Sequence, residues 1–440
     1  MKRLTQRLAE STLLRNAISL YGVQACRKVV PLISIPFLAR ALGPAGWGRA
    51  AFALSMGDFI VLVIEFGFTL SATREIARHR DDMKACGEIA TGTLGAQAVL
   101  SCIAVLCALI VASVTPMLRN DPKLVGTVLF YGVAQGLAPI WFFQGLERIH
   151  LAAGLEIAGK LLALAGLLAF VRHAGDEWKV LALQGIAPAL AVTGGLSLAH
   201  RIAPFSRPSR AGILHALRTG WGTFLLRSGV SMYSVGNGFI LGLFAPAPTV
   251  GFFTSSEKIC KAVCGLLLPI RDAIYPRLSH LAAHSPEKTE RLHRLGVIVM
   301  GLGGIFLSAA TFFGAPLMIR ILLGPGFEQA VPVLRILALL PAIIALTDSI
   351  GMQWLLPRGR EGDTSKVILA GGLLNVALAM LAAPHFRHIG MAWSVVTSET
   401  FVCLALVLIV IRSVMPSVLR WPSPVVEKAA GECVGTRSLR

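Results

Sequence analysis

The sequence predicts an all-α polytopic membrane protein. Three observations support this: an apolar composition, repeated apolar segments of bilayer length, and an alternation of basic and neutral loops. Of the 440 residues, 55% are hydrophobic and 15% are charged, and the mean hydropathy is +0.71. Soluble globular domains are about 25% charged, so this composition excludes that class. The net charge of +18 is then expected in loops at the membrane surface, which argues against nucleic-acid binding.

About twelve transmembrane helices are expected, because twelve segments are apolar over about 20 residues, the length that crosses a bilayer. In chain order they are 17–38, 49–70, 89–112, 124–145, 151–171, 180–200, 219–244, 249–270, 295–317, 331–356, 367–384 and 389–411. Gly, Pro and charged residues interrupt the first, seventh and eighth segments more than the others. The loops on one side are all short, so no extramembrane domain is expected there.

The distribution of Lys and Arg predicts the orientation. The chain ends and the loops after even-numbered segments hold 26 of the 41 basic residues, whereas the loops after odd-numbered segments hold 8, counting Arg49 at the first position of the second segment. Basic residues collect in the cytoplasmic loops of membrane proteins, so both termini are expected in the cytoplasm. The longer connections, 71–88, 201–218 and 271–294, then lie on the same side.

A weak internal repeat divides the chain into two six-helix bundles. A shift of 203 residues aligns Gly48 with Gly251, and both residues flank Pro- and Gly-rich turns between paired segments. Repeats of this kind are frequent in transporters. The expected units are an N-terminal bundle, a cytoplasmic linker, a C-terminal bundle and a disordered cytoplasmic tail, at 1–200, 201–218, 219–412 and 413–440.

Five basic residues lie in the middle of apolar segments. They are Arg27, Lys28, Arg227, Lys258 and Lys261. A basic side chain at the bilayer centre costs roughly 2.5 to 3.5 kcal/mol, so these residues predict an internal cavity for an anionic group such as a pyrophosphate. Lys258 and Lys261 are spaced to share one helix face, whereas Arg27 and Lys28 point about 100° apart and cannot form one clamp. The alternative is that nearby carboxylates neutralise these bases within the protein.

Acidic residues at membrane depth are candidates for ion coupling or for counter-charges. They are Asp58, Glu65, Glu257, Asp348 and Glu399. Asp58 and Glu65 share a helix face and could take up protons during transport or pair with Arg27. Glu257 lies one turn before Lys261 and could neutralise it. Arg335 is the expected partner of Asp348 or Glu399. No spacing of His, Cys or acidic residues predicts a metal site or a catalytic centre.

Four stretches carry a resemblance to a known family. They are PFLARALGPAGWGRAAFALS at 36–55, FGFTLSATREIARHR at 66–80, APIWFFQGLERI at 138–149 and GFFTSSEKICKAVCGLLLPIRDAIYPRLS at 251–279. The chain resembles the Wzx-type polysaccharide flippases of the MOP superfamily, which also holds the MATE drug exporters and the lipid II flippase MurJ. The resemblance spans most of the chain and implies a MATE-like fold, with two six-helix bundles around a central cavity.

The resemblance implies transport of undecaprenyl-pyrophosphate-linked oligosaccharides from the cytoplasmic to the periplasmic leaflet of the bacterial inner membrane. MurJ-like proteins have two further helices, so a repeat unit of O-antigen, capsule or exopolysaccharide is favoured over lipid II. No cofactor is implied, and a proton gradient, a Na⁺ gradient or the membrane potential would drive transport. The implied partners are the lipid-linked oligosaccharide, membrane lipids, a polysaccharide polymerase and a chain-length regulator.

Two other functions are alternatives. The nearest is an ion-coupled exporter of small molecules of the MATE type, and the second is a membrane-embedded polysaccharide polymerase or ligase. An excess of basic over acidic cavity groups argues against the first. The short outer loops argue against the second, because such enzymes are expected to carry a sizeable periplasmic loop. A transporter and not an enzyme is therefore predicted.

Overall fold

The computed structural model describes residues 2–234, 236–284 and 286–418. Side chains are described for these residues except at 2–29, 149, 151–152, 226–227, 229–234, 282–284, 286–287 and 413–418. Every regular element in the described ranges is helical, which confirms the predicted all-helical class. Of the predicted tail, residues 413–418 extend the last helix, and residues 419–440 lie outside the described residues.

Eight helices make up the first part of the chain. They are α1 (Lys2–Glu65), α2 (Phe68–Arg78), α3 (Met83–Val114), α4 (Pro116–Arg119), α5 (Pro122–Gly136), α6 (Ile140–Gly145), α7 (Ile149–Phe170) and α8 (Glu177–Ile202). Capping side chains explain where two of them begin. Asp82 Oδ1 accepts hydrogen bonds from the N–H groups of Lys84 and Ala85 at the start of α3. Asp121 Oδ1 accepts one from Leu124 N–H at the start of α5.

The second part begins with α9 and α10, which lie on either side of residue 235, outside the described residues. Its elements are α9 (Arg210–Ser234), α10 (Gly236–Phe244), α11 (Ala247–Cys264), η1 (Gly265–Leu267), α12 (Leu268–His284), α13 (Pro286–Leu322), α14 (Ala330–Leu337), α15 (Leu340–Ile350), η2 (Gly351–Leu355), η3 (Leu356–Arg358) and α16 (Glu361–Val418). The elements η1 and η3 are single 3₁₀ turns, and η2 is a π-helical turn that lies between α15 and η3 in the chain.

Eight helical stretches within the described residues are long and apolar enough to cross a membrane. Two of them, Val30–Arg78 and Glu361–Arg412, hold 49 and 52 residues, more than twice the length of one crossing. Each contains a kink with non-helical backbone angles, at Gly43 (φ 67°, ψ 177°) and at Arg387 (φ 50°, ψ −130°). The polytopic membrane fold is therefore confirmed. The count of twelve crossings, the two six-helix bundles and the boundaries at 201–218 stay predictions.

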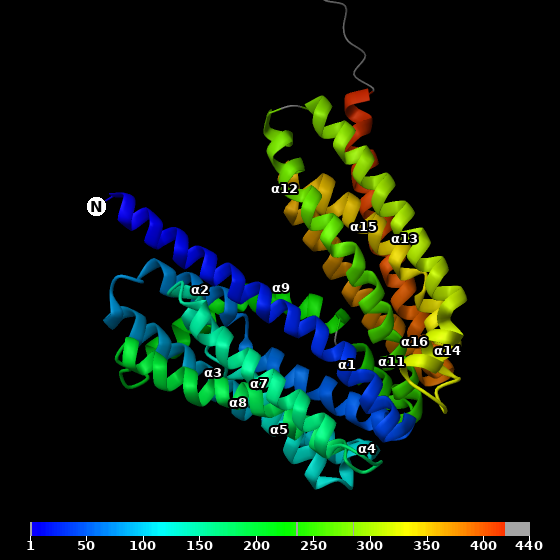
Figure 1. Ribbon diagram of the computed structural model, residues 1–440, viewed down its shortest axis with the longest axis horizontal. Coiled ribbons are helices and arrows are strands. Elements are labelled where there is room, and N and C mark those ends of the chain that lie inside the picture. The colour runs from blue at the N-terminus through cyan, green and yellow to red at the C-terminus, as the bar shows by residue number, and fades with distance from the viewer. Residues whose placement is uncertain (1, 235, 285, 419–440) are drawn as a thin grey trace, which may run out of the picture.

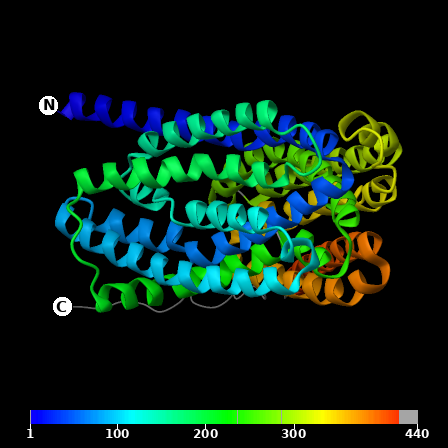
Figure 2. The same ribbon diagram turned by 90° about the horizontal axis from the view of Figure 1, so that it is seen from below.

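The helices form two groups that meet at one end and diverge at the other (Figure 1). The first group holds α1 to α8 and the second α11 to α16; seen from below, most helices run in one common direction (Figure 2). Helix α9 packs against α2 and α3 of the first group and also against α16 of the second. The start of α1, the connection between α2 and α3, the end of α12 and the start of α13 lie at the diverging end, here called the inner end (Figure 1).

The two groups meet at the other, outer end along a contact between α1 and α11, here called the outer seam (residues 44–48 and 247–251). A Cβ atom on Gly48 would lie 1.7 Å from the carbonyl oxygen of Ala247, and one on Gly251 would lie 2.5 Å from that of Pro44. Only glycine fits at such distances, so backbone packs directly on backbone. The 203-residue shift aligns these same two glycines, which lie against each other across the junction.

Candidate functional site

A cavity of about 630 Å³ lies between the two groups of helices, on the inner side of the outer seam. Residues of α1, α5, α7 and α8 line it from the first group, and residues of α11, η1 and α12 from the second. Its charged lining residues, among those described, are Lys160, Lys258 and Lys261, and no Asp or Glu joins them. The charged side chains of the described wall are therefore all basic, and two of the five predicted bases are among them.

Lys258 and Lys261 share one face of α11, and both line the cavity. Lys258 Nζ lies 4.8 Å from the centre of the Trp47 ring, a cation–π contact between α11 and α1. Lys261 Nζ lies 3.1 Å from Glu257 Oε1. The pairing of Lys261 with Glu257, which the one-turn spacing predicted, is confirmed, whereas substrate binding by either lysine stays a prediction.

A chain of buried polar side chains supports Glu257 from behind. Asn237 Nδ2 on α10 donates to Glu257 Oε1 at 3.0 Å, and Asn375 Nδ2 on α16 donates to Asn237 Oδ1 at 2.8 Å. Ser398 Oγ, also on α16, donates to Asn375 Oδ1 at 3.3 Å. All four side chains are buried. Hydrogen bonds of this kind hold a side chain in one orientation, so α10 and α16 position the carboxylate that holds Lys261.

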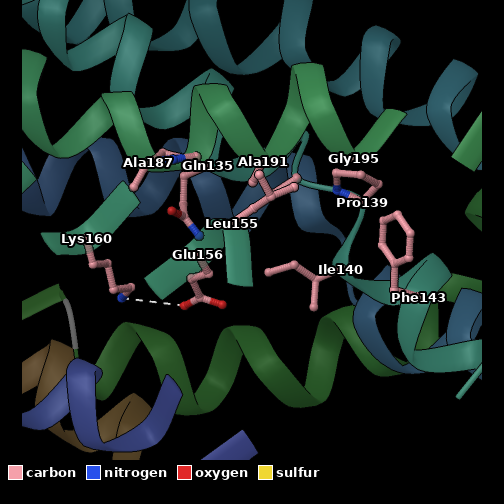
Figure 3. A pocket seen from close by; sticks show the side chains of 12 residues that line it. Gln135, Pro139, Ile140, Phe143, Leu155, Glu156, Lys160, Ala187, Ala191 and Gly195 are labelled. Carbon is pink, nitrogen blue, oxygen red and sulfur yellow. Dashed lines mark ion pairs between the residues drawn. The ribbon is translucent and has the colours of Figure 1, made fainter. Parts of the chain in front are cut away.

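Lys160 is a cavity residue that the sequence reasoning did not single out. It projects from α7, in the first group, while Lys258 and Lys261 project from the second. Its Nζ lies 3.5 Å from Glu156 Oε1, one turn earlier on the same helix (Figure 3). Lys160 meets the criterion used for the other five bases, because it lies near the middle of the apolar segment 151–171.

A small side pocket of about 30 Å³ opens beside Lys160, within the first group. Gln135 and Glu156 are its polar lining residues besides Lys160, and Leu155 and Ile140 are among the apolar ones (Figure 3). Gln135 and Lys160 line both this pocket and the main cavity. The pocket has room for about two water molecules, each needing roughly 10 to 15 Å³.

Neutral polar groups line the first-group side of the cavity. They are Ser34 on α1, Tyr131 and Gln135 on α5, and Gln184 on α8. The hydroxyl of Tyr131 donates to Asp58 Oδ1 at 2.9 Å, so Asp58 sits behind Tyr131 and does not itself line the cavity. Amide and hydroxyl groups both donate and accept hydrogen bonds, which suits sugar hydroxyls as ligands.

The remaining predicted acids do not line the cavity. Glu65 accepts a hydrogen bond from Thr69 Oγ1 at 2.8 Å. Asp348 pairs with Arg271 at 3.4 Å, and Glu399 makes no ion pair with a described residue. Their ion-coupling roles stay predictions.

The expected pairing of Arg335 with Asp348 or Glu399 is wrong. The guanidinium of Arg335 lies 5.5 Å from the centre of the Phe312 ring instead. Arg271, on α12, comes close enough to Asp348, on α15, to form the pair. Helix packing, which sequence spacing does not contain, decides between these partners.

Three of the predicted binding residues cannot be placed in the wall. Arg27 and Lys28 lie on α1 and Arg227 lies on α9, but their side chains are outside the described residues. Their proposed contacts with an anionic group stay predictions.

A sequence family described as polysaccharide biosynthesis protein matches residues 13–282, more than half of the chain. The chain belongs to this polysaccharide biosynthesis family. Four of the cavity helices, α5, α7, α8 and α11, lie wholly within the matched residues, as do the four stretches that carried the resemblance. The family predicted from those stretches is confirmed.

Relatives of this polysaccharide biosynthesis protein match along almost their whole length. A protein of Escherichia coli (strain K12) that carries the name O-antigen transporter is 29% identical over 408 residues, 91% of this chain and 97% of that protein. Two solved structures share the fold. The lipid II flippase MurJ in an inward closed conformation has a TM-score of 0.70 at 10% identity, covering 90% of this chain and 87% of MurJ. An inward-facing multidrug MATE transporter of the MOP superfamily has a TM-score of 0.65 at 15% identity, covering 93% of this chain and all of that one.

Proposed function

We propose that this protein is a flippase for lipid-linked polysaccharide repeat units. It would move undecaprenyl-pyrophosphate-linked oligosaccharides from the cytoplasmic to the periplasmic leaflet of the bacterial inner membrane, for O-antigen, capsule or exopolysaccharide synthesis. The observation that carries the proposal is the cavity lining, in which three lysines and no carboxylate stand among the described residues. Membership of the polysaccharide biosynthesis family and the name O-antigen transporter of the Escherichia coli relative support it.

The lysines can hold a pyrophosphate from two sides. Lys258 and Lys261 approach from α11, and Lys160 from α7. Lys is a compact point charge on a flexible stem, so three of them can follow a headgroup that shifts during transport. Tyr131, Gln135 and Gln184 then face the sugars.

Alternating access describes how the cavity empties. In this structure the outer seam is closed and the groups diverge at the inner end, where the headgroup would enter while the lipid tail stays in the bilayer (Figure 1). The two groups, organised as six and six helices, would then rock to open the seam. A negative-inside potential favours outward movement of an anion by about 2.3 kcal/mol per charge per 100 mV. Proton or Na⁺ coupling through Asp58 or Glu65 would add to this, without a cofactor.

The charge of the cavity separates this proposal from its alternatives. A MATE-type exporter of cationic molecules would need carboxylates where the lysines are, because like charges repel in a low-dielectric site. The products are proposed to pass to a polysaccharide polymerase and a chain-length regulator, so polymerisation is assigned to those partners and not to this chain.

Export in cells that lack their own flippase tests the proposal. The intact chain is expected to restore surface polysaccharide. The double variant Lys258→Gln with Lys261→Gln is expected to lose most of the export, and Lys366→Gln, an exposed lysine outside the cavity, is the control at matched membrane abundance. If the intact chain restores export and the double variant does so equally well, the lysines are structural. Failure of the intact chain with several repeat units, together with resistance to cationic drugs, would move the function to the exporter.

A further inference from the structure

A second cavity lies beside the outer seam, away from the lysine-lined one. Its volume is about 680 Å³, and it lies between α1 of the first group and α13, α14 and their connection in the second. Two arginines line it, Arg40 on α1 and Arg320 on α13, with Glu328 as the acid among the lining residues. The groups that move apart in alternating access thus each contribute one guanidinium.

The two arginines differ in what they bind within the protein. The guanidinium of Arg40 donates to the carbonyl oxygen of Ile321, at the end of α13, so it links α1 to the second group. Arg320 is exposed and makes no hydrogen bond or ion pair with any described residue. Glu328 accepts a hydrogen bond from the N–H of Gly326 at 3.1 Å, within its own loop, and pairs with neither arginine. Two positive charges and one negative charge leave the lining with one net positive charge.

The depth of this cleft matches that of lipid headgroups. Arg40 precedes the Gly43 kink by one turn, and Arg320 lies in the last turn of α13. At a rise of 1.5 Å per residue, the Cα atoms of both arginines lie within about 5 Å of the outer ends of their helices. This places the two residues near the outer membrane interface. Pro316, Ile319 and Val331 make the rest of the wall apolar, as a lipid-facing cleft requires.

We propose that this cleft binds the phosphate of an anionic phospholipid in the outer leaflet. Arginine presents several N–H groups in a planar fork that matches phosphate oxygens, and Arg320 has this fork available. A phosphodiester with one negative charge fits the single net charge of the lining. A pyrophosphate fits it less well, because Glu328 would repel the second phosphate.

Binding at this position acts on the conformation of the protein. A phosphate that contacts Arg40 and Arg320 bridges the two groups at their outer end, next to the contacts of Pro44 with Gly251 and Gly326. When the outer seam opens, α1 and α13 separate and the site is lost. A ligand that binds one state better shifts the population toward that state, so the phospholipid stabilises the outer-closed form.

Lipid binding to the purified full-length chain tests the site. Short-chain phosphatidylglycerol is titrated into delipidated protein, and bound lipid is counted by native mass spectrometry. Arg320→Gln is expected to lower the affinity about tenfold, since it removes charge-assisted hydrogen bonds. Arg119→Gln is the matched control, because Arg119 is another exposed arginine at a helix end on the outer side but lies outside the cleft. Equal affinity of Arg320→Gln and the control for phosphatidylglycerol would show that Arg320 does not bind the phosphate, and would overturn the proposal.

A distance measurement tests the conformational effect and the source of the phosphate. Labels at Arg78 and Glu290, exposed residues near the inner ends of the two groups, report on inner opening. Phosphatidylglycerol is expected to raise the inner-open population of the intact chain and not that of Arg320→Gln. A response to undecaprenyl pyrophosphate alone, retained when Lys258 and Lys261 are changed to Gln, would overturn the phospholipid assignment. Only this effect rests on the proposed alternating access, because lipid binding is measured without transport and can succeed where the export assay fails.

Discussion

The outer seam and the basic cavity lie next to each other on the same two helices and use opposite residue chemistry. At the seam, Gly48 and Gly251 remove side chains so that backbone meets backbone. Seven and ten residues further along α11, roughly 10 and 15 Å from Gly251, Lys258 and Lys261 line the cavity. Closure needs close approach of the helices, whereas recognition needs long side chains in a gap. The comparison shows how one helix pair can serve both as gate and as binding wall.

The largest expected effect comes from filling the seam. Gly48→Leu would place a side chain on the carbonyl oxygen of Ala247, and overpacking of this kind costs about 3 kcal/mol, or roughly a hundredfold in population. The outer-closed state should be depleted, seen as a shorter distance between labels at Arg78 and Glu290 and as lost export. Gly126→Leu is the control, because Gly126 has open space around it. Normal closure of Gly48→Leu would show that the seam is not a tight contact.

A smaller effect, on the stability of the fold, is expected from the ion pair that joins α1, after its kink at Gly43, to the start of α8. Glu177 is buried and lies 2.5 Å from the guanidinium of Arg49. The variant Glu177→Gln leaves Arg49 without its partner, but Arg49 is 37% exposed and water screens its charge, so the free energy of unfolding should fall by about 1.5 kcal/mol. Glu147→Gln, in an exposed pair with Arg80, should change it by about 0.5 kcal/mol. Denaturant unfolding of the two variants in the same detergent checks the contrast; equal losses would contradict it.

At the cavity, substitutions of Lys160 and of Glu156 should change the affinity for an anionic ligand in opposite directions. Lys160→Gln should weaken binding of a soluble isoprenoid pyrophosphate about tenfold, because a charge-assisted contact from the first group is lost. Glu156→Gln should tighten binding by a few fold, because it removes an acid that lies 3.5 Å from Lys160. Isothermal titration calorimetry compares them, with Lys366→Gln as control. Weaker binding by Glu156→Gln would mean that Glu156 holds Lys160 in its binding position.

The smallest effect is expected in the loop before α8, next to Glu177. The hydrogen bond from Lys179, together with those from backbone N–H groups, lowers the pKa of Asp176 from 3.8 to about 2. The carboxylate therefore stabilises the fold fully above about pH 3.8, and this contribution is lost as the pH falls through about 2. Asp176→Asn should cost about 0.5 kcal/mol at pH 7. The difference from the intact chain, measured by thermal unfolding, should shrink as the pH falls toward 2; a difference independent of pH would assign it to packing.

Local rules predicted the parts of this protein that depend on neighbours in the chain. The apolar segments lie on helices of the structure, and the pair of Glu257 with Lys261 follows from their one-turn spacing. Proline and glycine marked the outer turn at Gly43, where the backbone has a positive φ. The resemblance of four stretches was enough to predict the family, and all four lie within the matched residues 13–282.

Contacts between helices could not be predicted in the same way. Arg335 was expected to pair with Asp348 or Glu399, but Arg271 pairs with Asp348, because α12 and α15 bring these two side chains within 3.4 Å. Lys160 carries the same sequence signal as Arg227, a single base in an apolar segment, and only the packing of α7 against α1 and α8 shows that it faces the cavity. The pairing of Glu177 with Arg49 likewise joins residues far apart in the chain.

Composition, segment length and charge alternation together predicted a basic, all-helical membrane protein, because a bilayer imposes the same apolar length on every crossing. Tertiary packing alone decided which side chains share the cavity, which acids stand behind it, and that Gly48 and Gly251 close its outer end. The physical reason is that the cost of burying a charge or closing a seam depends on distances of a few ångströms between helices. Those distances are set by the packing of whole helix faces and not by spacing along one chain segment.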